Sequence, residues 1–373
     1  MSNTTAARGA VLEESGRDTP YAESTPISIS DVELDQPGEN EVRIKILAAG
    51  ICHSDLSVVN NNRPRPLPML LGHEASGVIE ELGPGVTDFE VGQHVVCTFL
   101  PRCEECKACK TEGRIPCERG SKANNDGTLL NGSRPIHRDG EEIHQHLGVS
   151  GFATHAVADI RSLVPIGEDV PPEIAAVLGC AILTGGGAVI NEIKPNEDTT
   201  IAVVGLGGVG AAAVLTAAAL GVKEIVGIDM QDSKRELALD LGCTEAMTPE
   251  EAEVSERKFD AVIEAAGHPK ALETAYKITG MGGMTVTVGL PAPGGVTAID
   301  PLAMTAEART LKGSYLGSAV PKTDIPKYEE LWREGKLEAE KLISSRIKLE
   351  DINEAMDKLD NGLSLRQVIM FDE

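Results

Sequence analysis

The stretch TIAVVGLGGVG, residues 200–210, leads from an apolar strand pattern into a glycine-rich turn and then an alanine-rich segment. Gly205, Gly207 and Gly210 have the spacing GxGxxG, and Gly208 lies between them. The first glycine permits a tight turn, the second lets a pyrophosphate approach the backbone, and the third lets a helix pack on the strand. The N-terminus of that helix favours anionic phosphates. The stretch therefore predicts a strand, turn and helix that bind a dinucleotide.

The segment EIVGID, residues 224–229, adds an acidic side chain to this motif. Asp229 follows the glycines at the distance, about 20 residues, where a carboxylate accepts hydrogen bonds from the adenosine ribose. A carboxylate there repels a 2′-phosphate, so the pattern favours NAD over NADP. The alternative is a glycine-rich packing motif that binds no nucleotide.

Further strand patterns follow the glycine motif along the chain. FDAVIEAAG (259–267) and GGMTVTVGL (282–290) alternate with helical stretches such as 232–242, which is typical of a parallel sheet in an α/β fold. The N-terminal third differs, because segments such as EVRIKILAAG (41–50) mix apolar alternation with Gly and Pro turns. A chain of 373 residues therefore divides into a β-rich domain and a doubly wound parallel sheet.

Four cysteines lie close together with regular spacing, at Cys103, Cys106, Cys109 and Cys117. Such spacing lets one loop surround a tetrahedral zinc ion. A disulfide reading requires an oxidising compartment, and the N-terminal residues show no secretory signal pattern. The loop therefore predicts a structural zinc site.

Three more potential metal ligands are scattered along the chain. Cys97 and Cys243 are interpreted as buried thiols, which leaves Cys52 and Cys180, with His73 between them in the sequence. A Cys, His, Cys set leaves one tetrahedral position open, as a catalytic zinc requires. Spacing alone does not show that the three meet, and Cys180 by itself is more simply a buried thiol.

The charge and hydropathy of the chain disfavour some classes of partner. A net charge of -24 repels phosphate backbones and anionic lipids, so we expect no nucleic-acid or membrane partner. Apolar stretches such as 211–220 are shorter than the roughly 20 residues that cross a bilayer. We expect a soluble, cytoplasmic protein. The acidity is consistent with simple solubility or with a high-salt habitat.

Several longer motifs of the chain resemble those of one enzyme family, the zinc-dependent medium-chain alcohol dehydrogenases. They occur in the family's order and at similar separations over nearly the whole length: GICHSDL, LLGHEASGVIEELGPGVTDFEVGQHV, the four-cysteine loop, LGCAILTGGG, VVGLGGVG and LSLRQVIMF. The resemblance implies a GroES-like catalytic domain at residues 1–182 with both zinc sites and a Rossmann domain at 183–323. Residues 324–373 would return to the catalytic domain, and a substrate cleft would lie between the domains.

The resemblance also implies roles for individual residues. Cys52, His73 and Cys180 would bind the catalytic zinc, with Glu74 behind the metal and Asp55 bonded to His73. Ser54 would receive the alcohol proton. The other family positions are His53 and Arg366 at the cofactor pyrophosphate, Thr184 and Val209 at the nicotinamide, Lys234 at the adenosine ribose, and Phe99 in the wall of the substrate pocket.

Some positions depart from branches of the family. Ser57 stands where some members carry a proton-relaying histidine, so proton release would be more direct or water-borne. The long segment after Cys117 resembles the animal, plant and glutathione-dependent branches, which favours a homodimer over a tetramer. Ser121 stands where glutathione-dependent members carry an arginine, and this disfavours a thiol-adduct substrate.

Three hypotheses follow for the function. The first is reversible hydride transfer from an alcohol to NAD, giving an aldehyde or ketone, with two zinc ions per chain. The second is oxidation of a thiol adduct of formaldehyde (an S-hydroxymethyl compound). The third is a nucleotide-binding protein that keeps the fold without catalysis.

Overall fold

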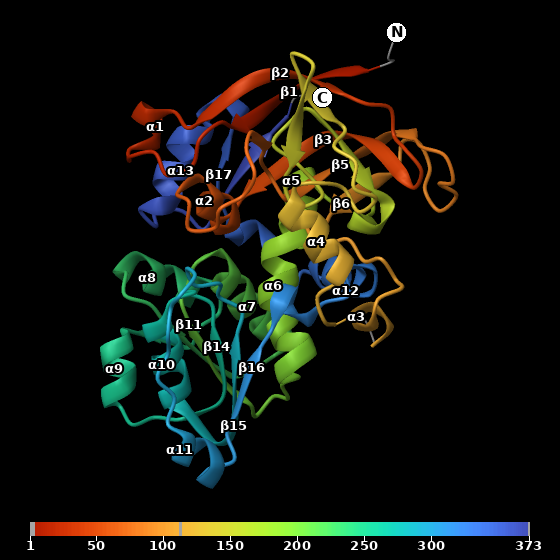
Figure 1. The fold of residues 1–373 in the computed structure, drawn as a ribbon. Helices are drawn as coiled ribbons and strands as arrows, with labels where there is room; N and C mark the ends of the chain where they lie inside the picture. The colour runs from red at the N-terminus through yellow and green to blue at the C-terminus, as the bar shows by residue number, and fades with distance from the viewer. Residues whose placement is uncertain (1–3, 112–113, 372–373) are drawn as a thin grey trace. The chain divides into compact units, whose positions relative to one another are not determined.

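The protein is described by a computed structural model that covers residues 4–111 and 114–371, and the chain divides into two compact units (Figure 1). Unit 1 comprises Met1–Cys180, Val320–Pro326 and Ile343–Glu373. Unit 2 comprises Ala181–Ala319 and Lys327–Leu342. The chain therefore passes between the units four times, at residues 181, 320, 327 and 343, so the expected C-terminal segment 324–373 is divided between them.

Unit 1 is built from two mainly antiparallel assemblies of strands, each with one parallel pair, β4 with β8 and β17 with β18. One is a closed barrel in the order β1-β2-β7-β8-β4, and the other is a sheet in the order β10-β6-β5-β3-β18-β17, with β9 paired to β3. The strands are β1 (Thr5–Leu12), β2 (Ile27–Leu34), β3 (Glu41–Ile51), β4 (Met69–Leu70), β5 (Glu74–Leu82), β6 (His94–Cys97), β7 (Ile136–Arg138), β8 (Glu141–Gln145), β9 (His155–Asp159), β10 (Leu163–Pro165), β17 (Ile343–Ile347) and β18 (Arg366–Met370).

Strand β3 is the centre of the sheet in unit 1. It pairs with β5, β9 and β18, so the C-terminal strand RQVIM is hydrogen-bonded beside the N-terminal third of the chain. Val42, Ile44 and Ile46 are fully buried on alternating positions of β3, as a strand with one face on the core requires. The helices of this unit are α1 (Tyr21–Ser24), α2 (His53–Val59), α3 (Lys107–Lys110), α4 (Glu118–Asp126), α5 (Pro172–Val177) and α13 (Ile352–Asp360).

Unit 2 contains a six-stranded parallel sheet in the order β13-β12-β11-β14-β15-β16. Its strands are β11 (Thr200–Val204), β12 (Glu224–Ile228), β13 (Glu245–Met247), β14 (Phe259–Glu264), β15 (Thr279–Thr287) and β16 (Thr310–Gly313). Its helices include α6 (Leu183–Gly187), α7 (Gly208–Ala219), α8 (Asp232–Asp240), α9 (Pro249–Val254), α10 (Pro269–Ile278) and α11 (Pro301–Ala306). This confirms the predicted doubly wound α/β fold.

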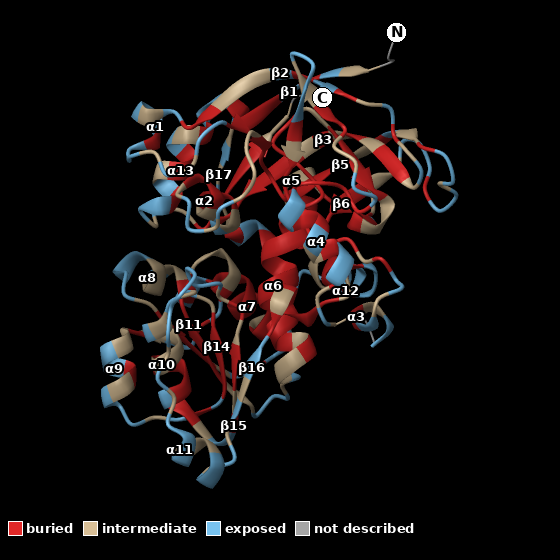
Figure 2. Ribbon diagram, in the orientation of Figure 1, coloured by how far each residue is buried: buried red, intermediate tan, exposed pale blue. Residues whose placement is uncertain are grey.

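Helices cover both faces of this sheet, which explains why the central strands are apolar throughout. Ala202 and Val204 pack with residues of α9 and α10 on one face. On the other face, Val203 lies against the start of α7 at Gly210. Figure 2 shows β11 and β14 buried over most of their length; the exceptions are the half-buried Thr200 and the exposed Asp260. Strands buried on both faces are the signature of a parallel sheet flanked by helices.

One helical segment departs from our expectation about apolar runs. Residues Pro172–Ile193 form a continuous helical stretch of 22 residues, and an 18-residue window within it has a mean hydropathy of 1.9, so the stretch is long and apolar enough in composition to cross a membrane. The expectation that no apolar run approaches this length was therefore wrong. The prediction missed it because Glu173 and the glycines from 185 to 187 interrupt the apolar letters. Its most apolar window is 89% buried within the fold, as in the core helix of a globular protein.

Candidate active site and metal sites

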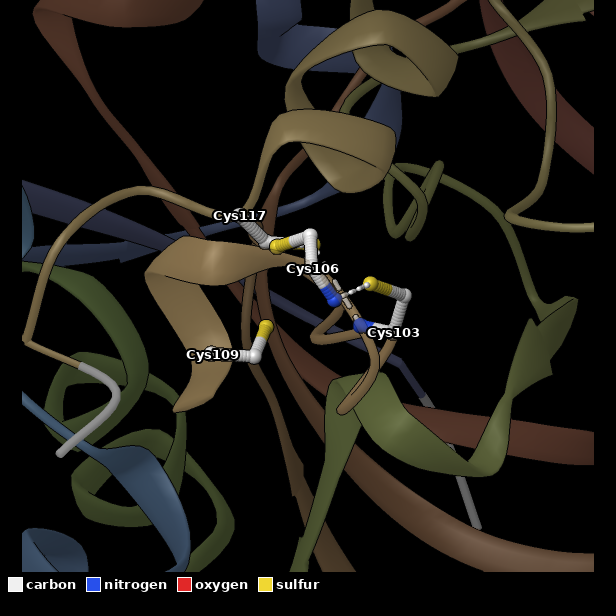
Figure 3. A group of neighbouring side chains, drawn as sticks. All are labelled: Cys103, Cys106, Cys109 and Cys117. Atoms are coloured by element: carbon white, nitrogen blue, oxygen red, sulfur yellow. Dashed lines mark hydrogen bonds between the residues drawn. The ribbon is translucent and has the colours of Figure 1, made fainter. Parts of the chain in front are cut away.

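The four cysteines of the loop before α4 come together in unit 1. The sulfur atoms of Cys103, Cys106, Cys109 and Cys117 all lie within 4.8 Å of one another, and Figure 3 shows the side chains turned toward a common centre. Cys106 immediately precedes α3 and Cys117 immediately precedes α4, so two short helices fix two of the four ligands. All eight cysteines of the chain are free thiols, which rules out the disulfide reading for this structure.

Backbone amides stabilise thiolates in this loop. Cys117 Sγ accepts hydrogen bonds from Cys103 N and Gly120 N, both at 3.3 Å, and Cys103 Sγ accepts one from Cys106 N at 3.4 Å. Hydrogen bonds from backbone groups at Cys109 and Glu118 lower the pKa of the Cys106 thiol to about 6. Burial and the neighbouring sulfurs of Cys106 and Cys117 raise the pKa of Cys109 to about 12. Zinc ligands must be deprotonated, so an ion bound in the loop would displace the proton of Cys109, and the four sulfurs are the donor set of a closed zinc site.

Cys52, His73 and Cys180 form a second cluster in unit 1. Their ligand atoms also lie within 4.8 Å of one another, and Cys180 Sγ is 3.3 Å from His73 Nε2. Cys52 immediately precedes α2, and His73 immediately precedes β5. Cys180 lies in a π-helical turn between α5 and α6, a local widening that is frequent at functional sites. Three side chains far apart in the sequence thus meet in a buried position with two sulfur donors and one nitrogen donor.

The charges around this cluster favour one thiolate. The pKa of Cys52 is well below its usual value, because Cys180 hydrogen-bonds its sulfur and because Arg366 and His73 add positive charge. The same hydrogen bond raises the pKa of Cys180. The two opposite shifts assign the thiol proton of the pair to Cys180. A divalent cation would replace that proton, since metal binding to thiols releases protons.

Asp55 orients the histidine of the cluster. Its Oδ1 lies 3.0 Å from His73 Nδ1, and its Oδ2 accepts a hydrogen bond from Cys52 N at 3.0 Å. Burial raises the pKa of Asp55, but the charge of His73 and the close approach of the His73 and His146 imidazoles outweigh burial and lower it to about 2. His73 therefore presents Nε2 to the cluster while Nδ1 faces a carboxylate, the arrangement that usually accompanies a zinc-bound histidine.

Glu74 and Arg366 form a buried ion pair beside the cluster. Arg366 Nε lies 3.2 Å from Glu74 Oε1, and Arg366 donates a further hydrogen bond to Ile51 O at 3.1 Å. Burial raises the pKa of Glu74 to about 7 against the opposing charge of Arg366. A Cβ at Gly50 would lie 2.2 Å from Glu74 Oε1, so only glycine leaves room for this carboxylate. The ion pair with Glu74 thus holds Arg366 beside the cluster of Cys52, His73 and Cys180.

The other predicted residues of unit 1 lie around the start of α2 and around His73. The ring of Phe99 meets the ring of His73 edge-on, with centroids 5.5 Å apart. Ser54 is half-buried in the first turn of α2, two residues after Cys52, and His53 is exposed beside it. The hydroxyl of Ser57 donates a hydrogen bond to His53 O at 2.7 Å.

In unit 2, the glycine motif has the geometry that its sequence predicts. Gly205 has a φ of 93°, and a Cβ there would lie 2.6 Å from Ala266 N. A Cβ at Gly210 would lie 1.9 Å from Gly205 O, so α7 packs on β11 more closely than any side chain allows. Asp229 Oδ2 accepts a hydrogen bond from Leu206 N at 2.8 Å, which ties the acidic residue to the turn. Gly207 caps α7 and Gly208 begins it.

Two further predicted cofactor residues of unit 2, Thr184 and Val209, belong to helices that cross closely. A Cβ at Gly185 would lie 2.1 Å from Val209 O, so the glycine next to Thr184 brings α6 against α7. Thr184 is buried and Val209 is half-buried. Lys234 is half-buried on α8, the helix that follows Asp229.

Sequence reasoning did not single out His146. Its side chain is 1% exposed, its ring centroid lies 5.7 Å from that of His73, and its Nδ1 is 3.3 Å from Asp55 Oδ1. It lies just after β8 in the segment EIHQHLG, where nothing in the spacing relates it to His73 or Asp55. A lone histidine in a loop carries no signal of this kind.

Comparison with known proteins agrees with this arrangement. Residues 38–168 match the alcohol dehydrogenase GroES-like domain, and residues 208–334 match the zinc-binding dehydrogenase domain. An alcohol dehydrogenase class-3 from Caenorhabditis elegans is 34% identical to the chain, and the match covers 95% of the chain and 96% of that protein. An NDMA-dependent alcohol dehydrogenase from Amycolatopsis methanolica is also 34% identical, over 97% of the chain and 98% of its own length.

A solved structure gives the same result. The benzyl alcohol dehydrogenase of Acinetobacter calcoaceticus superposes with a TM-score of 0.89 at 30% identity, covering 99% of the chain and 100% of that protein. Fold, domain models and full-length relatives agree, and the chain therefore belongs to the zinc-dependent alcohol dehydrogenases of the medium-chain dehydrogenase family.

Proposed function

We propose that this chain catalyses the reversible oxidation of an alcohol to an aldehyde or ketone with NAD, and that Cys52, His73 and Cys180 hold the catalytic zinc. The observation that carries the proposal is the meeting of these three ligand atoms within 4.8 Å of one another in a buried site. Two thiols and an imidazole match the donors of zinc, and three protein ligands leave a tetrahedral position for substrate. The four-cysteine loop would hold a second, structural zinc.

The zinc, when bound, would make the substrate hydroxyl more acidic and would polarise the carbonyl in the reverse direction. The residues of the chain supply the rest. Ser54 receives the proton of the hydroxyl, Asp55 holds His73 with its Nε2 toward the metal, and Phe99 forms part of the wall of the pocket. This division of roles is supported by the position of Ser54 two residues from Cys52 and by the ring contact between Phe99 and His73.

NAD is the proposed cofactor because of the charge at Asp229. Its two oxygens accept hydrogen bonds from Leu206 N and Gln231 N, at 2.8 and 3.0 Å, which fixes an anionic group at the end of β12. A 2′-phosphate brought to this carboxylate would experience like-charge repulsion, whereas a ribose hydroxyl could donate to it. His53, Lys234 and Arg366 are the proposed basic contacts of the cofactor.

The proposed assembly is a homodimer that forms through the edge of the sheet in unit 2. Strand β16 is the last strand of that sheet and is largely exposed. Large apolar side chains elsewhere in the unit are also exposed, including Met281 at 80% and Leu302 at 73%. Exposed edge strands and apolar side chains are features that association covers. The molecular mass in solution, by light scattering, would distinguish a dimer from a tetramer.

A direct test measures NADH formation with primary, secondary and benzylic alcohols, in the presence of NAD or NADP. We expect turnover with NAD and its loss in the Cys52→Ala variant. Cys97→Ala is the matched control, because Cys97 is a buried thiol whose pKa burial raises to about 12 and which belongs to neither cluster. Full activity of Cys52→Ala would overturn the assignment. Activity that depends on an added thiol would favour oxidation of a formaldehyde adduct instead.

A further inference from the structure

The carboxylate of Asp55 faces two imidazoles. His73 Nδ1 lies 3.0 Å from Asp55 Oδ1, and His146 Nδ1 lies 3.3 Å from the same oxygen. The rings of the two histidines are nearly perpendicular, at 89°, so His146 approaches the edge of its neighbour. A zinc-bound histidine needs only one carboxylate partner. The second imidazole is therefore a feature that the proposed zinc site does not by itself explain.

The backbone around His146 is committed to a tight turn. His146 O accepts hydrogen bonds from Val149 N and Ser150 N, both at 3.1 Å, and His146 N donates to Ser150 Oγ at 2.8 Å. Ser150 Oγ in turn donates to Leu70 O at 2.8 Å, which attaches the turn to β4. His146 is thus held firmly by its main chain, and only its ring remains to interact with Asp55.

This turn contains backbone strain. Leu147 and Ser150 have φ values of 51° and 52°, in the left-handed region that non-glycine residues rarely adopt. In this region the Cβ comes close to the following carbonyl oxygen, so it is unfavourable for residues other than glycine. Strain of this kind persists where the surrounding structure enforces it, and it concentrates at functional sites. The position of His146 is therefore maintained at a cost in stability.

The chemistry of Asp55 defines what His146 can contribute. An ionised carboxylate only accepts hydrogen bonds, so the Nδ1 that faces it must carry the proton. The approach of His146 lacks the geometry of a hydrogen bond, and neither of its ring nitrogens has a hydrogen-bond partner among the described residues. The contact is therefore a weak, buried N–H to carboxylate interaction, and in a site of low polarity such interactions are strengthened.

We propose that His146 is a positioning residue that acts through Asp55 and limits how strongly this carboxylate polarises His73. Part of the negative charge of Oδ1 is directed to the Nδ1–H of His146. The Nδ1–H of His73 then interacts with less negative charge on Asp55. Because of this, the imidazole of His73 donates less electron density to the metal through Nε2. A weaker donor leaves a bound zinc ion with more positive character, which favours activation of an alcohol. The inference rests on the proposed zinc site at Cys52, His73 and Cys180.

The test compares zinc affinities in three variants of this residue. His146→Phe keeps a ring against His73 but removes the N–H. His146→Asn keeps an amide N–H near the position of Nδ1, whereas His146→Gln places its amide farther from Asp55. The dissociation constant of the Cys52, His73, Cys180 site is measured by competition with a chelator, and the cobalt-substituted site is followed by its visible absorption. His144→Phe is the control, since this half-exposed neighbour lies outside both metal clusters.

We expect His146→Phe and His146→Gln to bind zinc about threefold more tightly than the wild type, which is less than the 10- to 100-fold typical of a direct partner. Their cobalt bands should move to shorter wavelength, while His146→Asn and His144→Phe should resemble the wild type. Equal or weaker binding in His146→Phe and His146→Gln, or an Asn variant that matches them, would overturn the inference. A wild-type chain with no zinc at this site would instead contradict the proposed function.

Discussion

The two candidate metal sites of unit 1 differ in how their ligands are assembled. The four-cysteine loop takes all of its donors from one short segment, residues 103–117, and backbone amides surround the sulfurs. The second site joins His73 to Cys180, which lies 107 residues away in sequence, and it is surrounded by buried charges. A local site with four thiols is complete without other ligands. A site with three distant ligands depends on the fold and keeps one position for chemistry.

We call the four-cysteine loop the local site, and the cluster of Cys52, His73 and Cys180, whose ligands lie far apart in the sequence, the distant site. The largest expected effect comes from removing a ligand of the distant site. Cys180→Ala should reduce turnover at least a thousandfold, because zinc contributes about 4 kcal/mol or more to activation of the alcohol. The variant should remain folded, and its melting temperature should fall only by the stabilisation that zinc at this site supplies, since the four-cysteine loop and both cores remain intact. The initial rate of NADH formation and a thermal unfolding curve check this. If Cys180→Ala were inactive because it is unfolded, the result would contradict the expectation that this site serves activity and the four-cysteine loop serves stability.

Removal of a ligand of the local site should affect stability first. Cys117 is fully buried and accepts hydrogen bonds from two backbone amides, so Cys117→Ala removes a zinc ligand and the partner of both amides. We expect a loss of about 3 kcal/mol in the free energy of unfolding, the linkage expected for zinc present a few hundred times above its dissociation constant. Urea denaturation measures it. An unchanged midpoint would mean that the loop binds no metal.

The carboxylate behind the distant site offers a finer test. Asp55→Asn retains the size of the side chain but removes its charge, so His73 loses its anionic partner. Zinc affinity at this site should fall by about 10- to 100-fold, as it does for the carboxylate partners of other zinc-bound histidines. Chelator competition measures the change. The four-cysteine site should keep its affinity in this variant, and a parallel loss at both sites would point to a general disturbance of unit 1.

The smallest expected effect concerns unit 2, outside both metal sites. Asp229→Ser should shift the preference from NAD toward NADP by about tenfold, the equivalent of roughly 1.4 kcal/mol of repulsion removed. Comparison of kcat/KM for the two cofactors checks this. Unchanged selectivity would mean that Asp229 does not face the adenosine ribose.

Much of the fold was predictable from the sequence because its signals are local. The strand before Gly205, the glycine spacing and the alanine-rich helix lie within 20 residues, and the structure forms them as β11 and α7. The C-terminal segment was harder to predict. Residues 327–342 belong to unit 2 although residues 320–326 and 343–373 belong to unit 1, and no periodicity indicates such crossings.

The candidate sites show the same limit. The four-cysteine loop was predictable from spacing alone, whereas Cys52, His73 and Cys180 were related to one another only by the resemblance to a family. His146 was not predictable by either route, because its approach to Asp55 depends on left-handed turn residues at Leu147 and Ser150. Single-residue conformations of this kind leave almost no trace in composition or periodicity.

The most direct test of the account is the number of zinc ions bound per chain, measured by native mass spectrometry for the wild type and for Cys52→Ala. The account predicts two ions in the wild type and one in the variant, with the remaining ion held by the four-cysteine loop. One ion in the fully zinc-loaded wild type, or two in the variant, would contradict it.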